Sequence, residues 1–211
     1  MKNYTAPNFK SSAVITIDTQ RDTLDGQPFE IPGTSAALPK IKIILDAYRQ
    51  KRRPIVHIVR IYKKDGSNVD LCRKETVENG AQTLLEGSSG CELASEMFQN
   101  FVSLDSKLLL SGKVQEISSH EAVIYKPRWG AFYNTPLESH LNNLGIDTLV
   151  FVGCNFPNCP RTSIYEASER DFKIVLVEDA ISGLYPKGKD EMLNIGIQVI
   201  NAETVKKAIT A

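Results

Sequence analysis

Three side chains with reactive groups follow strand-like apolar runs in the chain. Asp18 ends the run AVITID, Lys126 ends AVIYK, and Cys159 lies in the loop after DTLVFVG, directly before a helix that begins at Pro160. A thiol at the start of a helix feels the positive end of the helix dipole, which favours the thiolate. Backbone N–H groups of the first helical turn can stabilise an oxyanion. Cys159 is therefore a candidate nucleophile.

Asp18 and Lys126 carry groups that complement a nucleophile. Burial of Asp18 after an apolar strand would raise its pKa and a nearby lysine would lower it, a balance that can produce a general base. Lys126 enters a loop that holds the only tryptophan, Trp129, a setting that suits a pocket wall and a fixed cation. Each residue also has an ordinary structural interpretation: a turn-capping aspartate, a solvated lysine and a packed cysteine. Cys154, at the strand end, is interpreted as the packed cysteine.

Six short β-branched runs alternate with segments of helical spacing, and together they must position these side chains. Several runs are apolar on both faces, which is typical of parallel strands covered by helices on both sides. The sequence predicts an α/β fold, a Rossmann-like doubly wound and mostly parallel sheet. In such sheets the pocket forms at the carboxyl ends of the strands, where the three reactive groups are expected. The predicted strands are residues 13–18, 54–61, 122–126, 147–153, 173–180 and 198–202.

Residues 62–121 interrupt this alternation. They are rich in Gly, Ser and Asp, and a short helix is expected only near residues 92–100. Loops of this length are uncommon unless they are functional. Two interpretations stay open, a surface insertion at the sheet edge and a lid or subunit contact. By the length prior, residues 1–211 are expected to form a single domain around this insertion.

Composition excludes several classes of function. The 25 basic and 25 acidic residues cancel and are not massed in one stripe, so no nucleic-acid partner is expected. No apolar run approaches the ~20 residues that a membrane span needs. The first segment lacks the features of a secretory signal, and the four cysteines form no CxxC pair, so a cytoplasmic protein with free thiols is expected. The three histidines form no ligand cluster, and no metal or cofactor is predicted.

Three ordered segments of the chain resemble the isochorismatase-like cysteine hydrolases. The family pattern has Asp-x-Gln near the N-terminus, a lysine followed by a Ser/Gly-Ala-Phe motif, and a glycine with the catalytic cysteine six residues on, as Gly153 and Cys159 are spaced here. The resemblance covers most of the chain after residue 12, apart from 62–121. It implies the strand order 3-2-1-4-5-6 and a homo-oligomer, either a dimer or a tetramer. The segments are VITIDTQRD, YKPRWGAFYNTPLESHLNNLGIDTLVFVG and GCNFPNCPRTSIYEASERDFKIVLVEDA.

The resemblance also implies roles for individual residues. Asp18, Lys126 and Cys159 would form a catalytic triad. A cis peptide bond between Cys154 and Asn155 would aim the backbone N–H groups of Asn155 and Cys159 at an oxyanion. The candidate pocket residues, besides Asn155, are Gln20, Trp129, Phe132 and Phe156.

Departures from the family pattern narrow the expected chemistry. Nicotinamidases of this superfamily bind zinc through an Asp-x-His and a further His after the second strand, where this chain reads RIYKKD at 60–65. True isochorismatases lack the cysteine, so Cys159 indicates hydrolysis of a C–N bond in a small amide or carbamoyl compound. Cys159 is followed by Pro160 instead of the usual valine, and the preceding turn is also atypical, so the substrate stays open. Arg60 and Arg128 are candidates to meet an acidic substrate, although a solvated surface position is expected for each.

Two other functions fit the same residues. A non-catalytic oligomeric scaffold or a small-molecule binding protein would need only the fold, the pocket and an apolar interface, and its thiol would be unreactive. A redox sensor would use Cys154 and Cys159 as a reversible disulfide. Labelling of the Cys159 thiol and its dependence on Asp18 would separate the hydrolase from the scaffold.

Overall fold

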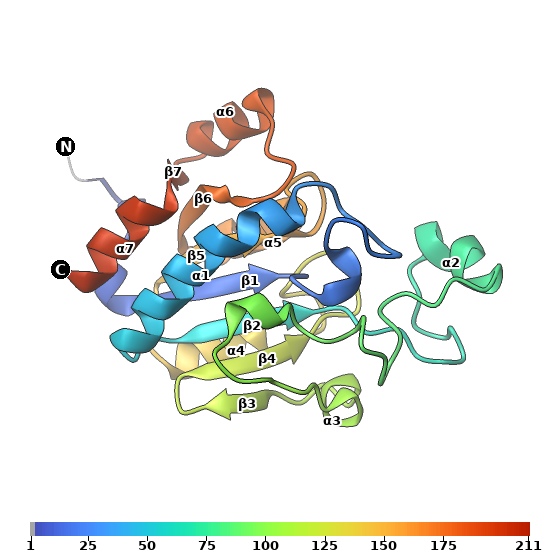
Figure 1. The fold of residues 1–211 in the computed structure, drawn as a ribbon. Helices are drawn as coiled ribbons and strands as arrows, with labels where there is room; N and C mark the ends of the chain where they lie inside the picture. The colour runs from blue at the N-terminus through green and yellow to red at the C-terminus, as the bar shows by residue number, and fades with distance from the viewer. Residues whose placement is uncertain (1–2) are drawn as a thin grey trace.

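Seven strands form one sheet in the computed structural model, which describes residues 3–211 (Figure 1). Their order is β3-β4-β2-β1-β5-β6-β7, and every neighbouring pair is parallel except β3 with β4. The doubly wound α/β fold is confirmed, and six of the strands lie in the order 3-2-1-4-5-6 that the family resemblance implied. The strands are β1 (Ser12–Ile17), β2 (Ile55–Val59), β3 (Gln115–Ser118), β4 (Glu121–Tyr125), β5 (Thr148–Gly153), β6 (Lys173–Ile181) and β7 (Gln198–Ile200).

The strand that the sequence pattern missed is β3. Its residues, QEIS, alternate between exposed and half-buried and contain one apolar side chain, so they lack the apolar run that marks the other strands. It pairs antiparallel with β4 at the edge of the sheet, with an irregularity between Glu116 and Ser118. Short, polar and irregular strands are common at sheet edges because they discourage pairing with another chain. The sheet therefore has seven strands instead of the six expected.

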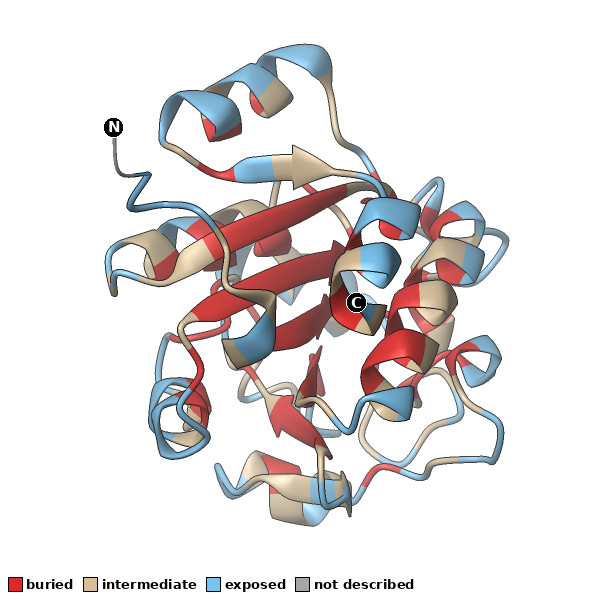
Figure 2. Ribbon diagram, turned by 90° about the vertical axis from the view of Figure 1, so that its left-hand side faces the viewer, coloured by how far each residue is buried: buried red, intermediate tan, exposed pale blue. Residues whose placement is uncertain are grey.

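Helices cover both faces of the sheet and create two apolar cores. β1, β2 and β5 are buried along their whole length (Figure 2), as expected for central parallel strands. Alternate side chains of one strand enter different cores: Val14 belongs to one core and its neighbour Ile15 to the other. The helices are α1 (Thr34–Gln50), α2 (Leu71–Glu78), α3 (Ser106–Leu110), α4 (Leu137–Asn143), α5 (Cys159–Ser168), α6 (Pro186–Asn194) and α7 (Ala202–Thr210), with 3-10 turns η1 (Phe9–Ser11), η2 (Arg21–Thr23) and η3 (Ser95–Met97).

The segment 62–121 divides into two parts with different surroundings. Leu93, Met97 and Leu109, from its second part, are buried in the core beside α1. Tyr62 and Leu84, from its first part, belong to a separate small apolar cluster. The helix expected near 92–100 is only the 3-10 turn η3, whereas α2 and α3 were not foreseen. Figure 1 shows α2 standing beyond the carboxyl ends of β1 and β2.

Within residues 3–211, no helix is both long and apolar enough to cross a lipid bilayer. All four cysteines are free thiols, of which only Cys72 is exposed. The proposed redox pair, Cys154 and Cys159, therefore has no disulfide in this structure.

Candidate active site

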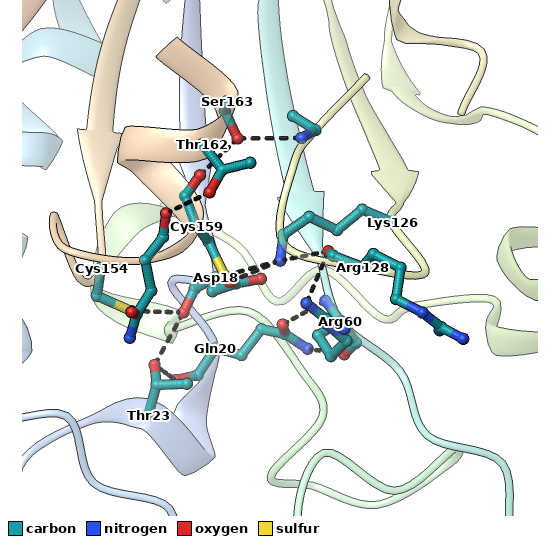
Figure 3. A network of polar contacts seen from close by, with 12 residues as sticks. Asp18, Gln20, Thr23, Arg60, Lys126, Arg128, Cys154, Cys159, Thr162 and Ser163 are labelled. Carbon is teal, nitrogen blue, oxygen red and sulfur yellow. Dashed lines mark hydrogen bonds and ion pairs between the residues drawn. The ribbon is translucent and has the colours of Figure 1, made fainter. Parts of the chain in front are cut away.

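The backbone of Asp18 is held in an unusual conformation at the end of β1. Its φ of 49° lies in the left-handed region, which aspartate tolerates better than most residues. Its N–H donates to the Ile58 carbonyl (2.9 Å). Its carbonyl accepts hydrogen bonds from the Thr23 hydroxyl (2.9 Å) and the Cys154 thiol (3.1 Å) (Figure 3). These contacts fix the residue in the turn after the strand and leave its carboxylate to face the neighbouring strand ends.

Gly153 allows the end of β5 to lie against β1. Its φ is 117°, and a Cβ atom at this position would lie 2.3 Å from the carbonyl oxygen of Ile17. Only glycine fits such a close approach. The next residue, Cys154, donates its N–H to that same carbonyl (2.9 Å) and is fully buried, and burial raises the pKa of its thiol far above the usual range. Cys154 is thus a packed thiol, as its position at the strand end predicted.

Lys126 brings the three predicted catalytic side chains together. It follows β4, which is separated from β5 by β2 and β1, and its long side chain spans this gap. The ammonium Nζ lies 2.9 Å from Asp18 Oδ2 and 3.2 Å from Cys159 Sγ (Figure 3). The Lys126 side chain has no exposed area. A buried ammonium is stable only with such partners, so its position is tied to the carboxylate and the thiol.

The surroundings of the Cys159 thiol disfavour its thiolate. Cys159 is the first residue of α5 and is 4% exposed. Burial raises the pKa of the thiol, the negative charge of Asp18 raises it further, and the charges of Lys126 and Arg60 lower it by less. The helix start was expected to favour the thiolate. Burial and the neighbouring carboxylate act against the thiolate, and the two cations act in its favour.

Three hydrogen-bonding groups near the thiol have no partner in the part of the chain that the structure describes. Asp18 Oδ1 is buried and has no hydrogen-bond partner within residues 3–211. In the same part of the chain the backbone N–H groups of Asn155 and Cys159 donate to no acceptor. An acceptor beside the thiol and two unused donors in the adjoining turn are what proton transfer and oxyanion binding require.

The peptide bond between Cys154 and Asn155 is trans, as is every peptide bond among the described residues, so the expected cis bond is wrong. The turn satisfies its backbone differently: the Cys154 N–H bonds to Ile17 and the Phe156 N–H donates to the Ser182 carbonyl (2.8 Å). The oxyanion hole stays a prediction, supported by the two unused N–H groups.

A small cavity lies against the thiol. Its volume is about 10 Å³, which is room for about one water molecule. Asp18, Arg60 and Cys159 line it together with residues from three separate segments. The other lining residues are Thr23, Phe29, Ile31, Arg73, Leu84, Cys154 and Asn155.

Gln20, one of the predicted pocket residues, does not line this cavity. It is fully buried, and its amide NH₂ donates to the carbonyls of Arg60 (2.8 Å) and Cys91 (2.6 Å). Its amide oxygen accepts from the Arg60 N–H (2.8 Å). The side chain is fully engaged in joining the end of β2 to the loop at Cys91. Its role is therefore to fix the backbone beneath the site.

The three predicted pocket aromatics also lie outside the cavity wall. Phe132 and Phe156 are buried in the core on the side of α4, α5 and α6, where they pack against other rings. Trp129 is half-buried, and the Arg73 guanidinium lies 5.6 Å from its ring centre. Trp129 thus contacts Arg73, a residue of the cavity wall. The sequence alone could not show which aromatic side chains of the loops face the cavity.

Arg60 is the largest departure from the expected site. It was expected at the solvated surface, yet it is 1% exposed and lines the cavity. One guanidinium nitrogen donates to both carboxylate oxygens of Asp70 (2.8 and 2.6 Å), and the other donates to the Arg128 carbonyl (2.7 Å). Its Nε, also buried, has no partner within residues 3–211. The burial of Arg60 could have been predicted from its position near the end of the apolar run PIVHIVRI. Arg128 is exposed, as expected.

Arg73, on α2, was not foreseen at all. Its guanidinium donates to the Tyr62 hydroxyl (2.9 Å) and to Asp70 Oδ2 (3.3 Å), and it lies 4.8 Å from the ring centre of Phe29. Tyr62 in turn donates to Asp70 (2.8 Å). The first part of segment 62–121 therefore contributes an ionic cluster and a wall to the site. No motif in that segment signals this arrangement.

Comparison with known proteins places the chain in a family. Residues 12–203 match the family model described as the isochorismatase domain. The chain belongs to the isochorismatase family. A probable inactive nicotinamidase from Arabidopsis thaliana is 24% identical over 200 residues, which cover 92% of this chain and 93% of that protein. N-carbamoylsarcosine amidase from an Arthrobacter species is 25% identical over 178 residues, 82% of this chain and 60% of that protein.

A solved structure supports the same assignment. An isochorismatase family protein from Desulfovibrio vulgaris matches with a TM-score of 0.79 and 26% sequence identity, covering 95% of this chain and 99% of that one. The resemblance drawn from the three sequence segments is thus confirmed. The isochorismatase family includes hydrolases named as amidases and also a relative named as probably inactive. Activity therefore depends on the geometry of the individual site.

The residues after β2 do not fit a zinc ion of the kind described above for nicotinamidases. Arg60 places a guanidinium there, and Asp70 is already bound by it at two oxygens. Residues 3–211 contain no group of three His, Cys, Asp or Glu side chains placed to hold a metal. The fixed cations of this isochorismatase-family site are Lys126 and Arg60.

Proposed function

We propose that this protein is a cysteine hydrolase that cleaves a C–N bond of a small amide or carbamoyl compound through a thioester on Cys159. One observation carries the proposal: Lys126 Nζ lies within 2.9 Å of Asp18 Oδ2 and within 3.2 Å of Cys159 Sγ, and Asp18 and Cys159 both line a cavity. Nucleophile, base and a fixed cation in mutual contact form the arrangement that covalent catalysis uses.

The first half of the reaction begins with a neutral thiol. The Asp18 carboxylate accepts the Sγ proton of Cys159 as the sulfur attacks the carbonyl carbon, which forms a tetrahedral intermediate with a negative oxygen. The unused N–H groups of Asn155 and Cys159 are proposed to bind that oxygen. Asp18 then returns the proton to the leaving nitrogen, the C–N bond breaks, and ammonia or an amine departs while the acyl group stays on sulfur.

The second half restores the enzyme. Asp18 takes a proton from a water molecule, the resulting hydroxide attacks the thioester carbon, and the C–S bond breaks. The proton on Asp18 passes to the departing sulfur, so the thiol and the carboxylate are regenerated. Lys126 keeps its charge throughout: it holds the carboxylate beside the sulfur and offsets the negative charge that develops there.

A screen for ammonia release over small amides and ureido compounds tests the proposal. The wild type is compared with Cys159→Ala and with Cys72→Ala, which removes an exposed thiol that does not line the cavity, as a matched control. We expect release from at least one compound by the wild type and by Cys72→Ala, and none above background by Cys159→Ala. Activity that persists in Cys159→Ala would exclude a covalent mechanism.

A non-catalytic scaffold or binding protein is the alternative. The small cavity, about 10 Å³, favours it, because the wall must move before a substrate can enter. This function predicts no thioester, which mass spectrometry of protein quenched during turnover would detect as an added acyl mass on Cys159. A cytoplasmic homo-oligomer stays a prediction, and light scattering on the purified protein tests its oligomeric state.

A further inference from the structure

Two arginines in the cavity wall have donors that the protein does not use. Arg60 is 1% exposed, and its buried Nε has no hydrogen-bond partner within residues 3–211. Arg73 has a side chain that is 20% exposed, and its hydrogen bonds to Tyr62 and Asp70 both come from one terminal nitrogen. A buried N–H without an acceptor is unfavourable by an amount comparable to a lost hydrogen bond. The structure therefore keeps donor capacity at the wall beside Cys159.

The charges around the cavity do not cancel. The charged residues that line it are Asp18, Arg60 and Arg73. Their ion-pair partners are Lys126, which binds Asp18, and Asp70, which binds both arginines. Three cations thus face two carboxylates and leave one positive charge. An excess charge in a buried site is unfavourable until an ion of opposite sign compensates it.

Each of the two guanidinium groups is also oriented by several contacts in this structure. Arg60 is fixed by Asp70 and by the carbonyl of Arg128. Arg73 lies 4.8 Å from the ring centre of Phe29 and 5.6 Å from that of Trp129, distances typical of cation–π contacts. Planar, preorganised guanidinium groups suit a carboxylate, which they can bind through paired N–H groups.

The wall that carries Arg73 can move without disturbing either core. A cavity of about 10 Å³ admits about one water molecule, so a substrate must displace part of the wall. None of the eight residues of α2 is buried, and segments with few buried contacts open at low free energy. Arg73 can therefore leave and return with α2, and a bound anion would favour its return.

We propose that the substrate carries a carboxylate, bound by Arg60 and Arg73, on the same small molecule whose amide or ureido carbonyl meets Cys159. This substrate class rests on the proposed hydrolase function. It assigns to Arg60 and Arg73 the selection of the substrate, whereas the chemistry at the carbonyl belongs to Asp18, Lys126 and Cys159.

Binding measured without turnover tests this assignment separately from catalysis. Cys159→Ala protein is titrated with succinamate, which carries an amide and a carboxylate, and with succinamide, its neutral isostere, and the fluorescence of the single Trp129 reports binding. We expect succinamate to bind about 10- to 100-fold more tightly, the range for hydrogen bonds to charged groups. N-carbamoylglycine and its neutral amide form a second pair for the ureido class.

Variants in the same Cys159→Ala background assign the effect to residues. Arg73→Gln should abolish most of the preference for the anion, and Arg60→Lys, which keeps a cation beside Asp70, should reduce it. Lys74→Gln removes an equal charge from an exposed neighbour on α2 and should leave it intact. Equal affinity for anionic and neutral partners, no saturable binding of either, or equal effects of Arg73→Gln and Lys74→Gln would overturn the proposal.

The two proposals fail in different ways. Ammonia release by the wild type from neutral amides, without anion preference, would overturn the carboxylate site and leave the hydrolase intact. Anion binding that depends on Arg73, without ammonia release from any amide, would support the carboxylate site and count against hydrolysis.

Discussion

Two buried ionic networks use residues in or directly after strands β1, β2 and β4, and they differ in how completely they are paired. One surrounds the thiol at the carboxyl ends of the strands, and we call it the cavity network. The other lies within the sheet on the α1 side, and we call it the structural network. The cavity network consists of Asp18, Lys126, Cys159 and Arg60, and the structural network of Thr16, His57, Glu121 and Arg49.

The structural network is fully satisfied. The His57 ring bonds to the Thr16 hydroxyl at 2.8 Å and to Glu121 at 2.9 Å. Arg49 binds both oxygens of Glu121 (2.7 and 3.1 Å) and donates to the Met97 carbonyl (2.7 Å). None of these side chains has a buried nitrogen or oxygen without a partner. Such closed networks stabilise one arrangement of a core.

The cavity network is left open. Asp18 Oδ1 and Arg60 Nε are both buried and unpaired within residues 3–211, and both residues line the cavity. Unpaired groups of this kind lower stability, and proteins retain them mainly where function uses them. The structural network therefore stabilises the sheet, whereas the cavity network keeps hydrogen-bonding groups that a substrate could use.

The largest effect is expected from Cys159→Ala. Removal of the nucleophile should lower kcat/KM at least about 10³-fold, in line with nucleophile deletions in other hydrolases. The free energy of unfolding should change by less than about 2 kcal/mol, since only one small side chain is truncated. Steady-state kinetics and urea denaturation measure the two quantities. A decrease of several kcal/mol in the free energy of unfolding would show that the cavity network also stabilises the fold. The two networks would then not differ in this respect.

Asp18→Asn should separate reactivity from catalysis. Activity should fall by about 10²- to 10⁴-fold because the general base is lost. The pKa of Cys159 should fall, because the Asp18 charge that raises it is removed while Lys126 and Arg60, which lower it, remain. Thiolate absorbance against pH, taken as a difference from Asp18→Asn/Cys159→Ser, measures the shift. A pKa that rises or stays constant would show that the Asp18 charge does not suppress the thiolate.

Glu121→Leu should have the opposite profile to Cys159→Ala. It leaves His57 and Arg49 without their acceptor, and breaking such a pair should lower the free energy of unfolding by about 2–4 kcal/mol. At temperatures where the variant stays folded, kcat/KM should remain within about threefold. Lys42→Ala, which removes an exposed i,i+4 pair with Asp46, is the matched control and should change stability by about 0.5 kcal/mol or less. Similar losses in both variants would refute the structural assignment.

The same contrast explains what the sequence could predict. The β-branched runs predicted six strands and placed Asp18, Lys126 and Cys159 at one sheet edge, because strand ends are local features. The burial of Arg60 was missed because its partner, Asp70, comes from a segment without a recognisable pattern. The raised pKa of Cys159 was missed because a thiol's pKa depends on burial and on a carboxylate 141 residues earlier in the chain.

The smallest expected effect concerns acidity. Burial lowers the pKa of His57 below its usual 6.5. For Glu121, the hydrogen bonds from His57 and Arg49 outweigh burial and lower the pKa of the carboxyl to about 2. As pH falls below 6.5, the unfolded chain therefore takes up a proton at His57 that the folded protein resists. The free energy of unfolding should decrease by up to about 1.4 kcal/mol per pH unit from this group.

Glu121 adds to this loss once pH falls below 4.5, until its own folded pKa is reached. His57→Gln should flatten the dependence between pH 6.5 and 5. His140, whose pKa burial also lowers, contributes in the same direction to wild type and variant alike, so their difference isolates His57. Urea denaturation across this range measures it. An unchanged slope in His57→Gln would mean that the acid response between pH 6.5 and 5 does not arise from His57.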